Sequence, residues 1–143
     1  MCLERCNGTT ETIDANLKQI QQHLDVMTSV SFECYNLGPN STLVQNNLTV
    51  VSPQLQQMGL ETWPMVSSYP YPPQFLEWMR QVFANPQPFV DQCIQEGLKW
   101  NYTGFNIDWE PTTDASAQDA IDYANFLTYL TNNLHKKGLK VSF

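Results

Sequence analysis

Strand-like and helix-like segments alternate along most of this 143-residue sequence, and this alternation limits the possible folds more than any other feature. Apolar residues recur every three or four positions in the expected helices, and they alternate or cluster in the expected strands. The expected helices cover residues 12–27, 73–84, 88–98 and 112–138. The expected strands cover residues 29–37, 59–69, 102–111 and 139–143. Strands that alternate with helices form parallel sheets, because each helix returns the chain to the same edge.

Four strands with their helices correspond to roughly half of a (β/α)8 TIM barrel, which takes about 250 residues. The pattern begins with a helix and ends within the strand at 139–143. An open parallel sheet that ended there would leave an unpaired edge. We therefore expect an α/β fold in which residues 1–143 form a single incomplete TIM-barrel catalytic domain, a fragment of a longer protein. Between the first two strands, residues 37–47 are expected to form a polar loop.

The charge of the chain excludes two classes of partner. The formal net charge is −7, whereas binding to nucleic acid or to an anionic membrane requires a basic surface. No apolar run approaches the roughly 18 residues that a membrane helix needs. We expect neither nucleic acid nor a membrane as partner.

Asparagine sequons of the form Asn-x-Ser/Thr suggest a glycoprotein, and they occur at Asn7, Asn40, Asn47 and Asn101. The first ten residues lack the apolar region of a signal peptide. We therefore expect the true N-terminus to lie upstream and the protein to be secreted or lysosomal.

The four cysteines form an even set that suits disulfides in an oxidising compartment: Cys2, Cys6, Cys34 and Cys93. Buried free thiols at Cys34 and Cys93 are the alternative. The spacings match no zinc pattern, and the only histidines are His23 and His135. No metal site and no cofactor are expected.

The segment "YTGFNIDWEP", residues 102–111, carries two acids within an apolar, aromatic run. Because side chains alternate along a strand, Asp108 and Glu110 share one face with Gly104 and Asn106. The apolar side chains share the other face, which suits packing against helices: Phe105, Ile107 and Trp109. Pro111 ends the strand, which leaves Glu110 at the carboxyl end, where barrel enzymes hold their active sites.

Gly104-Phe105-Asn106-Ile107-Asp108-Trp109-Glu110 resembles the fourth-strand signature of glycoside hydrolase family 18, the chitinases and chitobiases, written D-G-x-D-x-D-x-E. This resemblance implies that Glu110 is the general acid and that Asp108 orients the N-acetyl group of the substrate. That group would attack the anomeric carbon itself, so no nucleophilic carboxylate is needed on another strand. The implied reaction is the hydrolysis of β-1,4-linked N-acetylglucosamine oligosaccharides with retention.

The sequence departs from the family pattern at several positions. Thr103 and Asn106 stand where the motif has its first two aspartates, although an asparagine at the second position is similar to the chitobiase branch and can still hydrogen-bond Asp108. The preceding strand offers Ser67 and Ser68 in place of the family's Ser-x-Gly-Gly. The Tyr-Asp pair and the sugar-stacking Trp of later strands would lie beyond the last residue.

Aromatic side chains near the preceding strand are candidates for sugar binding: Trp63, Tyr69 and Tyr71. Glu33 lies near the end of an earlier strand, and the alternation of Val30, Phe32 and Cys34 leaves open whether its side chain enters the barrel.

Three other functions remain open at this point. One is a non-catalytic chitin-binding, lectin-like barrel, although such proteins typically lose the acid. Another is a barrel glycosidase that uses a second glutamate as nucleophile. In such enzymes Asn-Glu-Pro ends the fourth strand, and Trp109-Glu110-Pro111 is similar to it. A third is an inactive half-barrel.

Overall fold

The computed structural model describes residues 10–45, 51–111 and 115–143. Its helices are α1 (Thr10–Gln22), α2 (Ser52–Gln57), α3 (Phe75–Ala84), α4 (Gln87–Lys99) and α5 (Ala117–His135), with a short 3-10 turn η1 (Pro39–Ser41). Its strands are β1 (Ser29–Gly38), β2 (Thr42–Gln45), β3 (Glu61–Ser67), β4 (Gly104–Asp108) and β5 (Lys140–Ser142). All four helices and all four strands that the pattern predicts are present.

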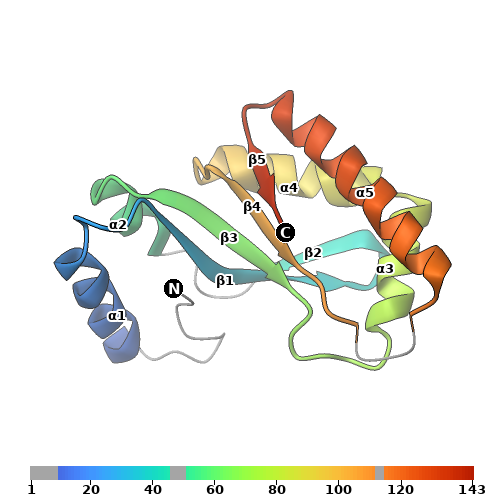
Figure 1. Ribbon diagram of the computed structural model, residues 1–143, viewed down its shortest axis with the longest axis horizontal. Helices are drawn as coiled ribbons and strands as arrows, with labels where there is room; N and C mark the ends of the chain where they lie inside the picture. Colours follow the sequence, from blue (N-terminus) through green and yellow to red (C-terminus); the bar gives the residue numbers. More distant parts are fainter. Residues whose placement is uncertain (1–9, 46–50, 112–114) are drawn as a thin grey trace.

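The strands form one sheet in the order β2-β1-β3-β4-β5 (Figure 1). The pairs β1–β3, β3–β4 and β4–β5 are parallel, as the alternation of strands and helices predicts. The sheet therefore grows by one strand after each helical crossover, which is the arrangement of a (β/α)8 barrel.

The expectation of a polar loop at 37–47 is wrong in part, because Thr42–Gln45 forms β2 antiparallel to β1. A tight turn through Asn40 (φ 55°) reverses the chain, and a Cβ atom at Gly38 would lie 2.6 Å from the Thr42 side chain. Since β2 is a short, mostly exposed edge strand, its sequence carries no apolar alternation. Helix α2 was also not predicted; it has only six residues.

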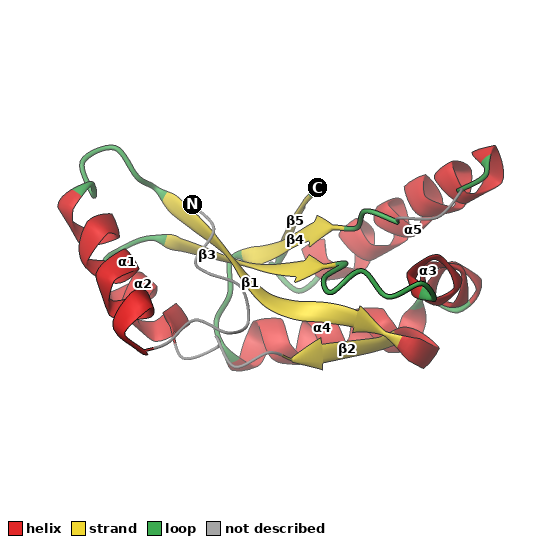
Figure 2. Cartoon of the chain, turned by 90° about the horizontal axis from the view of Figure 1, so that it is seen from below, coloured by secondary structure: helices red, strands yellow, loops and turns green. Residues whose placement is uncertain are grey.

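Helices cover one face of the sheet, and no described helix covers the other (Figure 2). We call the second one the inner face. Register and side-chain alternation assign to it Ser31, Glu33, Asn36, Trp63, Met65, Ser67, Gly104, Asn106, Asp108 and Ser142. On β4 and just after it, the helix-covered face carries the buried apolar side chains of Phe105, Ile107 and Trp109, which confirms the predicted division of residues 104–109 between two faces.

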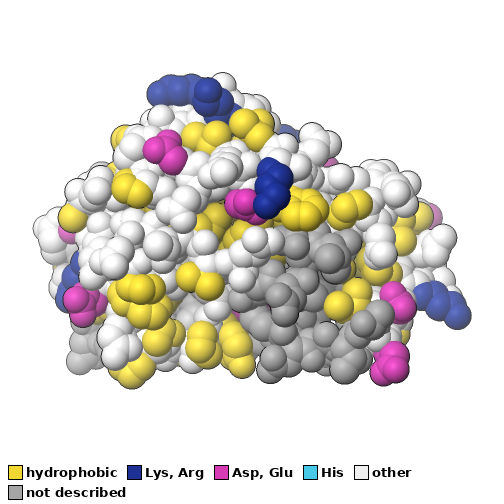
Figure 3. Space-filling view, turned by 180° about the vertical axis from the view of Figure 1, so that it is seen from behind, with side chains coloured by type: hydrophobic (Ala, Val, Ile, Leu, Met, Phe, Trp, Pro, Cys, Tyr) yellow, Lys and Arg dark blue, Asp and Glu magenta, His cyan; other side chains and the backbone are white. Residues whose placement is uncertain are grey.

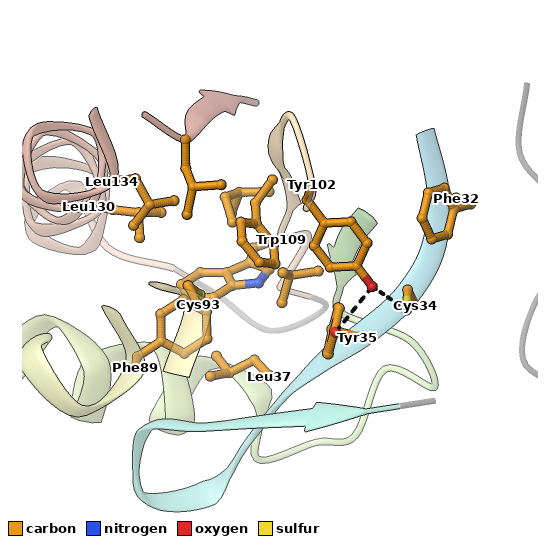
Figure 4. Packing of buried hydrophobic residues seen from close by; sticks show 14 of the residues in the cluster. Phe32, Cys34, Tyr35, Leu37, Phe89, Cys93, Tyr102, Trp109, Leu130 and Leu134 are labelled. Atoms are coloured by element: carbon orange, nitrogen blue, oxygen red, sulfur yellow. Dashed lines mark hydrogen bonds between the residues drawn. The ribbon is translucent and has the colours of Figure 1, made fainter. Parts of the chain in front are cut away.

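Trp109 anchors the helix-covered face of β4 in the core (Figure 4). Its indole stacks on Phe126 of α5 at 5.1 Å with an interplanar angle of 5°, and it meets Phe89 of α4 edge-on at 5.5 Å. Phe75 of α3 packs edge-on against the same indole at 6.2 Å. One tryptophan thus fixes three helices relative to β4, and the residue before Glu110 is held rigidly.

An irregularity in β1 decides which of its side chains reach the inner face. The parallel register shifts between Glu33 and Tyr35, so that Cys34 is an extra residue in the strand. As a result Tyr35 turns to the helix-covered face, while Glu33 and Asn36 lie on the inner face. There Tyr35 donates a 2.8 Å hydrogen bond to Glu96 of α4 and lies 3.3 Å, oxygen to oxygen, from Tyr102 (Figure 4). Burial raises the pKa of Tyr35 far above its usual range.

Cys34 and Cys93 are both fully buried. The Cys34 sulfur lies 4.0 Å from the Tyr102 hydroxyl oxygen, whereas Cys93 is a free thiol whose pKa is raised by burial. The structure thus agrees with the buried-thiol alternative for Cys93. Cys2, Cys6, Asn7 and Asn47 lie outside the described residues.

Charged residues make up 15% of the chain. On the face shown in Figure 3, Lys and Arg side chains stand at separate places and form no continuous patch. None of the helices in the described ranges is both long and apolar enough to cross a membrane.

Replacing Gly104 with alanine should destabilise the full-length protein by about 1–3 kcal/mol. A Cβ atom at Gly104 would lie 2.2 Å from the carbonyl oxygen of Lys140, so β4 and β5 could no longer approach each other. Chemical denaturation would measure the loss. Gly97→Ala is the matched control, because the atoms nearest its Cβ belong to side chains and not to the backbone: the end of Leu139 at 2.6 Å, which can shift, and the Phe105 ring at 3.2 Å. Equal losses for both variants would contradict the explanation.

Candidate active site

The candidate site lies where β3 and β4 end on the inner face. Ser67, the last residue of β3, pairs in register with Asp108, the last residue of β4. Asp108 is partly buried, whereas Glu110 is exposed two residues further along. Because parallel strands point the same way, these side chains gather at the carboxyl end of the sheet, the end that carries the active site in barrel enzymes.

Ser68 fixes the backbone around both acids. The Ser68 side-chain oxygen accepts a 3.1 Å hydrogen bond from the Glu110 amide, and the Ser68 amide donates a 3.2 Å bond to the Asp108 carbonyl oxygen. Ser68 itself is 2% exposed. These two bonds continue the pairing of β3 and β4 past the end of the strands, so Glu110 projects from an anchored backbone.

The predicted residues Tyr69 and Tyr71 belong to the loop between β3 and α3, and Tyr71 reaches the acid. Its hydroxyl donates to the Glu110 carboxylate at 3.5 Å, the long limit of a hydrogen bond. The two tyrosine rings meet edge-on at 6.2 Å, and both side chains are partly buried. The structure therefore brings Tyr69, Tyr71 and Glu110 together at one end of the sheet.

Trp63 lies apart from this group, near the amino end of β3. Its indole nitrogen donates a 3.1 Å hydrogen bond to Glu61, the first residue of that strand. Lys140, the first residue of β5, lies 3.0 Å from Glu61 and 6.0 Å from the Trp63 ring centre. The role of Trp63 in substrate binding stays a prediction, and the surroundings of Trp63 give that role no support.

Asn106 occupies the inner face one pleat before Asp108. Its amide donates a 2.9 Å hydrogen bond to the Ser142 hydroxyl on the neighbouring strand β5. This bond ties β4 to β5 below the acids, so Asn106 supports the site from the side opposite to Ser67. The sequence-based expectation was a bond to Asp108 instead.

One tyrosine on the helix-covered side, Tyr123, is affected by the charge of Asp108. Burial, together with the nearby Asp108 carboxylate, raises the pKa of Tyr123 on α5 to about 12. Within the described part of the chain, no cluster of three His, Cys, Asp or Glu side chains could hold a metal ion.

Three contributors to the site were not identified from the sequence, namely Asn36, Ser68 and Ser142, and for Glu33 the sequence left the face undetermined. Each acts through a hydrogen bond that joins neighbouring strands, or the segments that directly follow them, across a large distance in sequence. Ser68 had been noted only as a departure from the family's glycines, and a hydroxyl that satisfies the Glu110 amide explains what a serine does there.

Comparison with solved structures places this geometry in a known fold. The chitinase from Chromobacterium violaceum superposes with a TM-score of 0.75 at 19% identity, over 99% of this chain and 44% of that one. The chain folds as part of a chitinase-type TIM barrel. A class V chitinase from Nicotiana tobaccum, solved in complex with NAG4, matches with a TM-score of 0.65 at 14% identity, over 96% of this chain and 38% of that one.

One curated protein is also similar in sequence. It is an uncharacterized glycosylase, YvbX, from Bacillus subtilis (strain 168), 22% identical over 138 residues, which cover 93% of this chain and 39% of that protein. No family model matches the chain. The chain thus spans less than half the length of the proteins it matches, and the predicted partial barrel is confirmed as the fold.

Proposed function

We propose that this chain is the acid-bearing part of a glycoside hydrolase that cleaves chains of β-1,4-linked N-acetylglucosamine. The observation that carries the proposal is the position of Glu110. It is an exposed carboxyl group just past the carboxyl end of β4, with its amide held by Ser68 and its carboxylate within reach of Tyr71. The similarity to chitinases, one of them in complex with NAG4, supports the substrate class.

In the proposed reaction Glu110 protonates the glycosidic oxygen as the bond to the anomeric carbon breaks. The carbonyl oxygen of the substrate's own N-acetyl group attacks that carbon from the other side and forms a cyclic intermediate. Asp108, partly buried on the inner face, orients the N-acetyl group and stabilises the positive charge that develops on it. Glu110 then acts as a base toward water, which opens the intermediate with retention of configuration.

Activity should depend on the N-acetyl group of the substrate. We expect the full-length protein to release sugars from chitooligosaccharides and to leave fully deacetylated oligosaccharides of the same length intact, because the latter lack the attacking oxygen. Product analysis by chromatography and mass spectrometry measures both reactions.

Cleavage of the deacetylated substrate would favour instead the mechanism with a second glutamate as nucleophile. Binding of chitooligosaccharides without any released sugar would favour a lectin-like barrel. The presence of Glu110 argues against the lectin, because a binding protein has no use for an acid at this position.

The proposed activity belongs to a chain longer than residues 1–143 and to a location outside the cytosol. The activity is assigned to the complete barrel, because the matched chitinase is more than twice as long as the aligned region, and the isolated 143-residue chain is expected to be inactive. We also propose a secreted or lysosomal glycoprotein. Its sequons at Asn40 and Asn101 are exposed and therefore accessible to glycans.

A further inference from the structure

Glu33 is a buried carboxyl group on the inner face that takes no part in the reaction proposed above. Only 3% of it is exposed. The Ser67 hydroxyl donates to its Oε1 atom at 2.5 Å, and Ser67 is equally buried. Burying a carboxyl group costs free energy unless donors satisfy it, so an acid at this position requires an explanation.

The bond to Glu33 decides what Ser67 can do for the next residues. A hydroxyl has one hydrogen and two lone pairs. Because the hydrogen of Ser67 is directed to Glu33, its lone pairs are free to accept, and one of them accepts a 3.0 Å hydrogen bond from the Tyr69 amide. Glu33 therefore orients the hydroxyl that holds the start of the β3–α3 loop.

The same loop is held from β1 a second time and ends at the acid. Asn36, on the other side of the irregularity in β1, donates its side-chain amide to the Tyr69 carbonyl oxygen. The Tyr71 amide donates a 2.8 Å bond to the Ser68 carbonyl oxygen, and the Tyr71 hydroxyl reaches Glu110. Both contacts from β1 exist because the register shift turns Glu33 and Asn36 to the same face.

We propose that Glu33 is a positioning residue of the candidate active site: its carboxylate orients the Ser67 hydroxyl, which holds the Tyr69 backbone and keeps Tyr71 against Glu110. The effect on catalysis rests on the proposed function, whereas the effect on the loop does not. The two are therefore measured separately.

The first measurement is the exchange rate of the Tyr69 amide hydrogen in the full-length protein. Glu33→Leu removes the acceptor, and we expect the Tyr69 amide to exchange about tenfold faster, the effect of losing one hydrogen bond. Glu33→Gln keeps an acceptor oxygen of the same reach and should restore the slow exchange. Glu96→Leu is the matched control, since it removes a partly buried carboxyl group that accepts from Tyr35 and Trp100 on the helix-covered side.

The second measurement is the rate of sugar release. Glu33→Leu should lower kcat by about tenfold or more, because Tyr71 loses its fixed position beside the acid. Glu33→Gln should recover most of the rate, and folded Glu96→Leu should keep it. Ser67→Ala should cause the same loss as Glu33→Leu, and the double variant should lose no more than either, since both act through one bond.

The outcomes separate the two proposals. Unchanged Tyr69 exchange in Glu33→Leu, or equally fast exchange in Glu96→Leu, overturns the positioning role. Faster exchange in Glu33→Leu with an unchanged kcat overturns its catalytic consequence. Faster exchange in a protein whose unmodified form releases no sugar supports the effect on the loop and overturns the proposed function.

Discussion

Replacing Glu110 with glutamine should lower kcat for chitooligosaccharide cleavage by about 10²–10⁴-fold, the usual contribution of a general acid. Glutamine keeps the size of the side chain and can still accept from the Tyr71 hydroxyl, which the structure places at 3.5 Å. It cannot give a proton to the leaving oxygen. Binding of the oligosaccharide should therefore survive, and calorimetric titration of the variant would measure it beside the kinetic assay.

The control for Glu110 is Glu77→Gln in the first turn of α3, which neutralises an exposed glutamate and should leave kcat unchanged. Equal thermal unfolding of both variants would exclude a folding defect. Undiminished turnover by Glu110→Gln would refute the assignment of the acid. Loss of both binding and turnover would point to a structural role at the end of β4.

Asp108→Asn should lower kcat by about 10²–10³-fold, in the range of lost transition-state stabilisation. The substitution keeps the shape of the side chain and removes its charge. Asp108 ends β4 on the inner face, in register with Ser67, so it lies where the N-acetyl group would be held under the proposed mechanism. The rate measured with an N-acetylated substrate under single-turnover conditions tests this step directly.

Asp108 also separates the two glycosidase mechanisms. If a second glutamate were the nucleophile, Asp108 would have no special role and its variant would lose only a few-fold in rate. Asp91→Asn on α4 is the matched control, because Asp91 is exposed and accepts only a surface hydrogen bond from Gln87 at 2.7 Å. A mild phenotype at Asp108 together with a large one at Glu110 would favour the second glutamate.

The sequence by itself determined the class of fold and the orientation of the central strand. Periodicity located α1, α3, α4 and α5, because each helix buries one apolar stripe that repeats every three or four residues. The alternation in residues 104–110 was sufficient to predict that Asp108 and Glu110 face away from the helices. The other side of this segment carries Trp109, which packs against aromatic side chains of the helices.

Only the tertiary structure decided how the acids are supported. The register shift in β1 inserts Cys34 and turns Glu33 and Asn36 to one face, and no local pattern in the sequence predicts such an extra residue. The hairpin strand β2 was missed because an exposed edge strand needs no apolar alternation. The bonds from Ser67, Ser68 and Ser142 join residues 34 to 42 positions apart in sequence, so they become visible only when parallel strands bring these positions side by side.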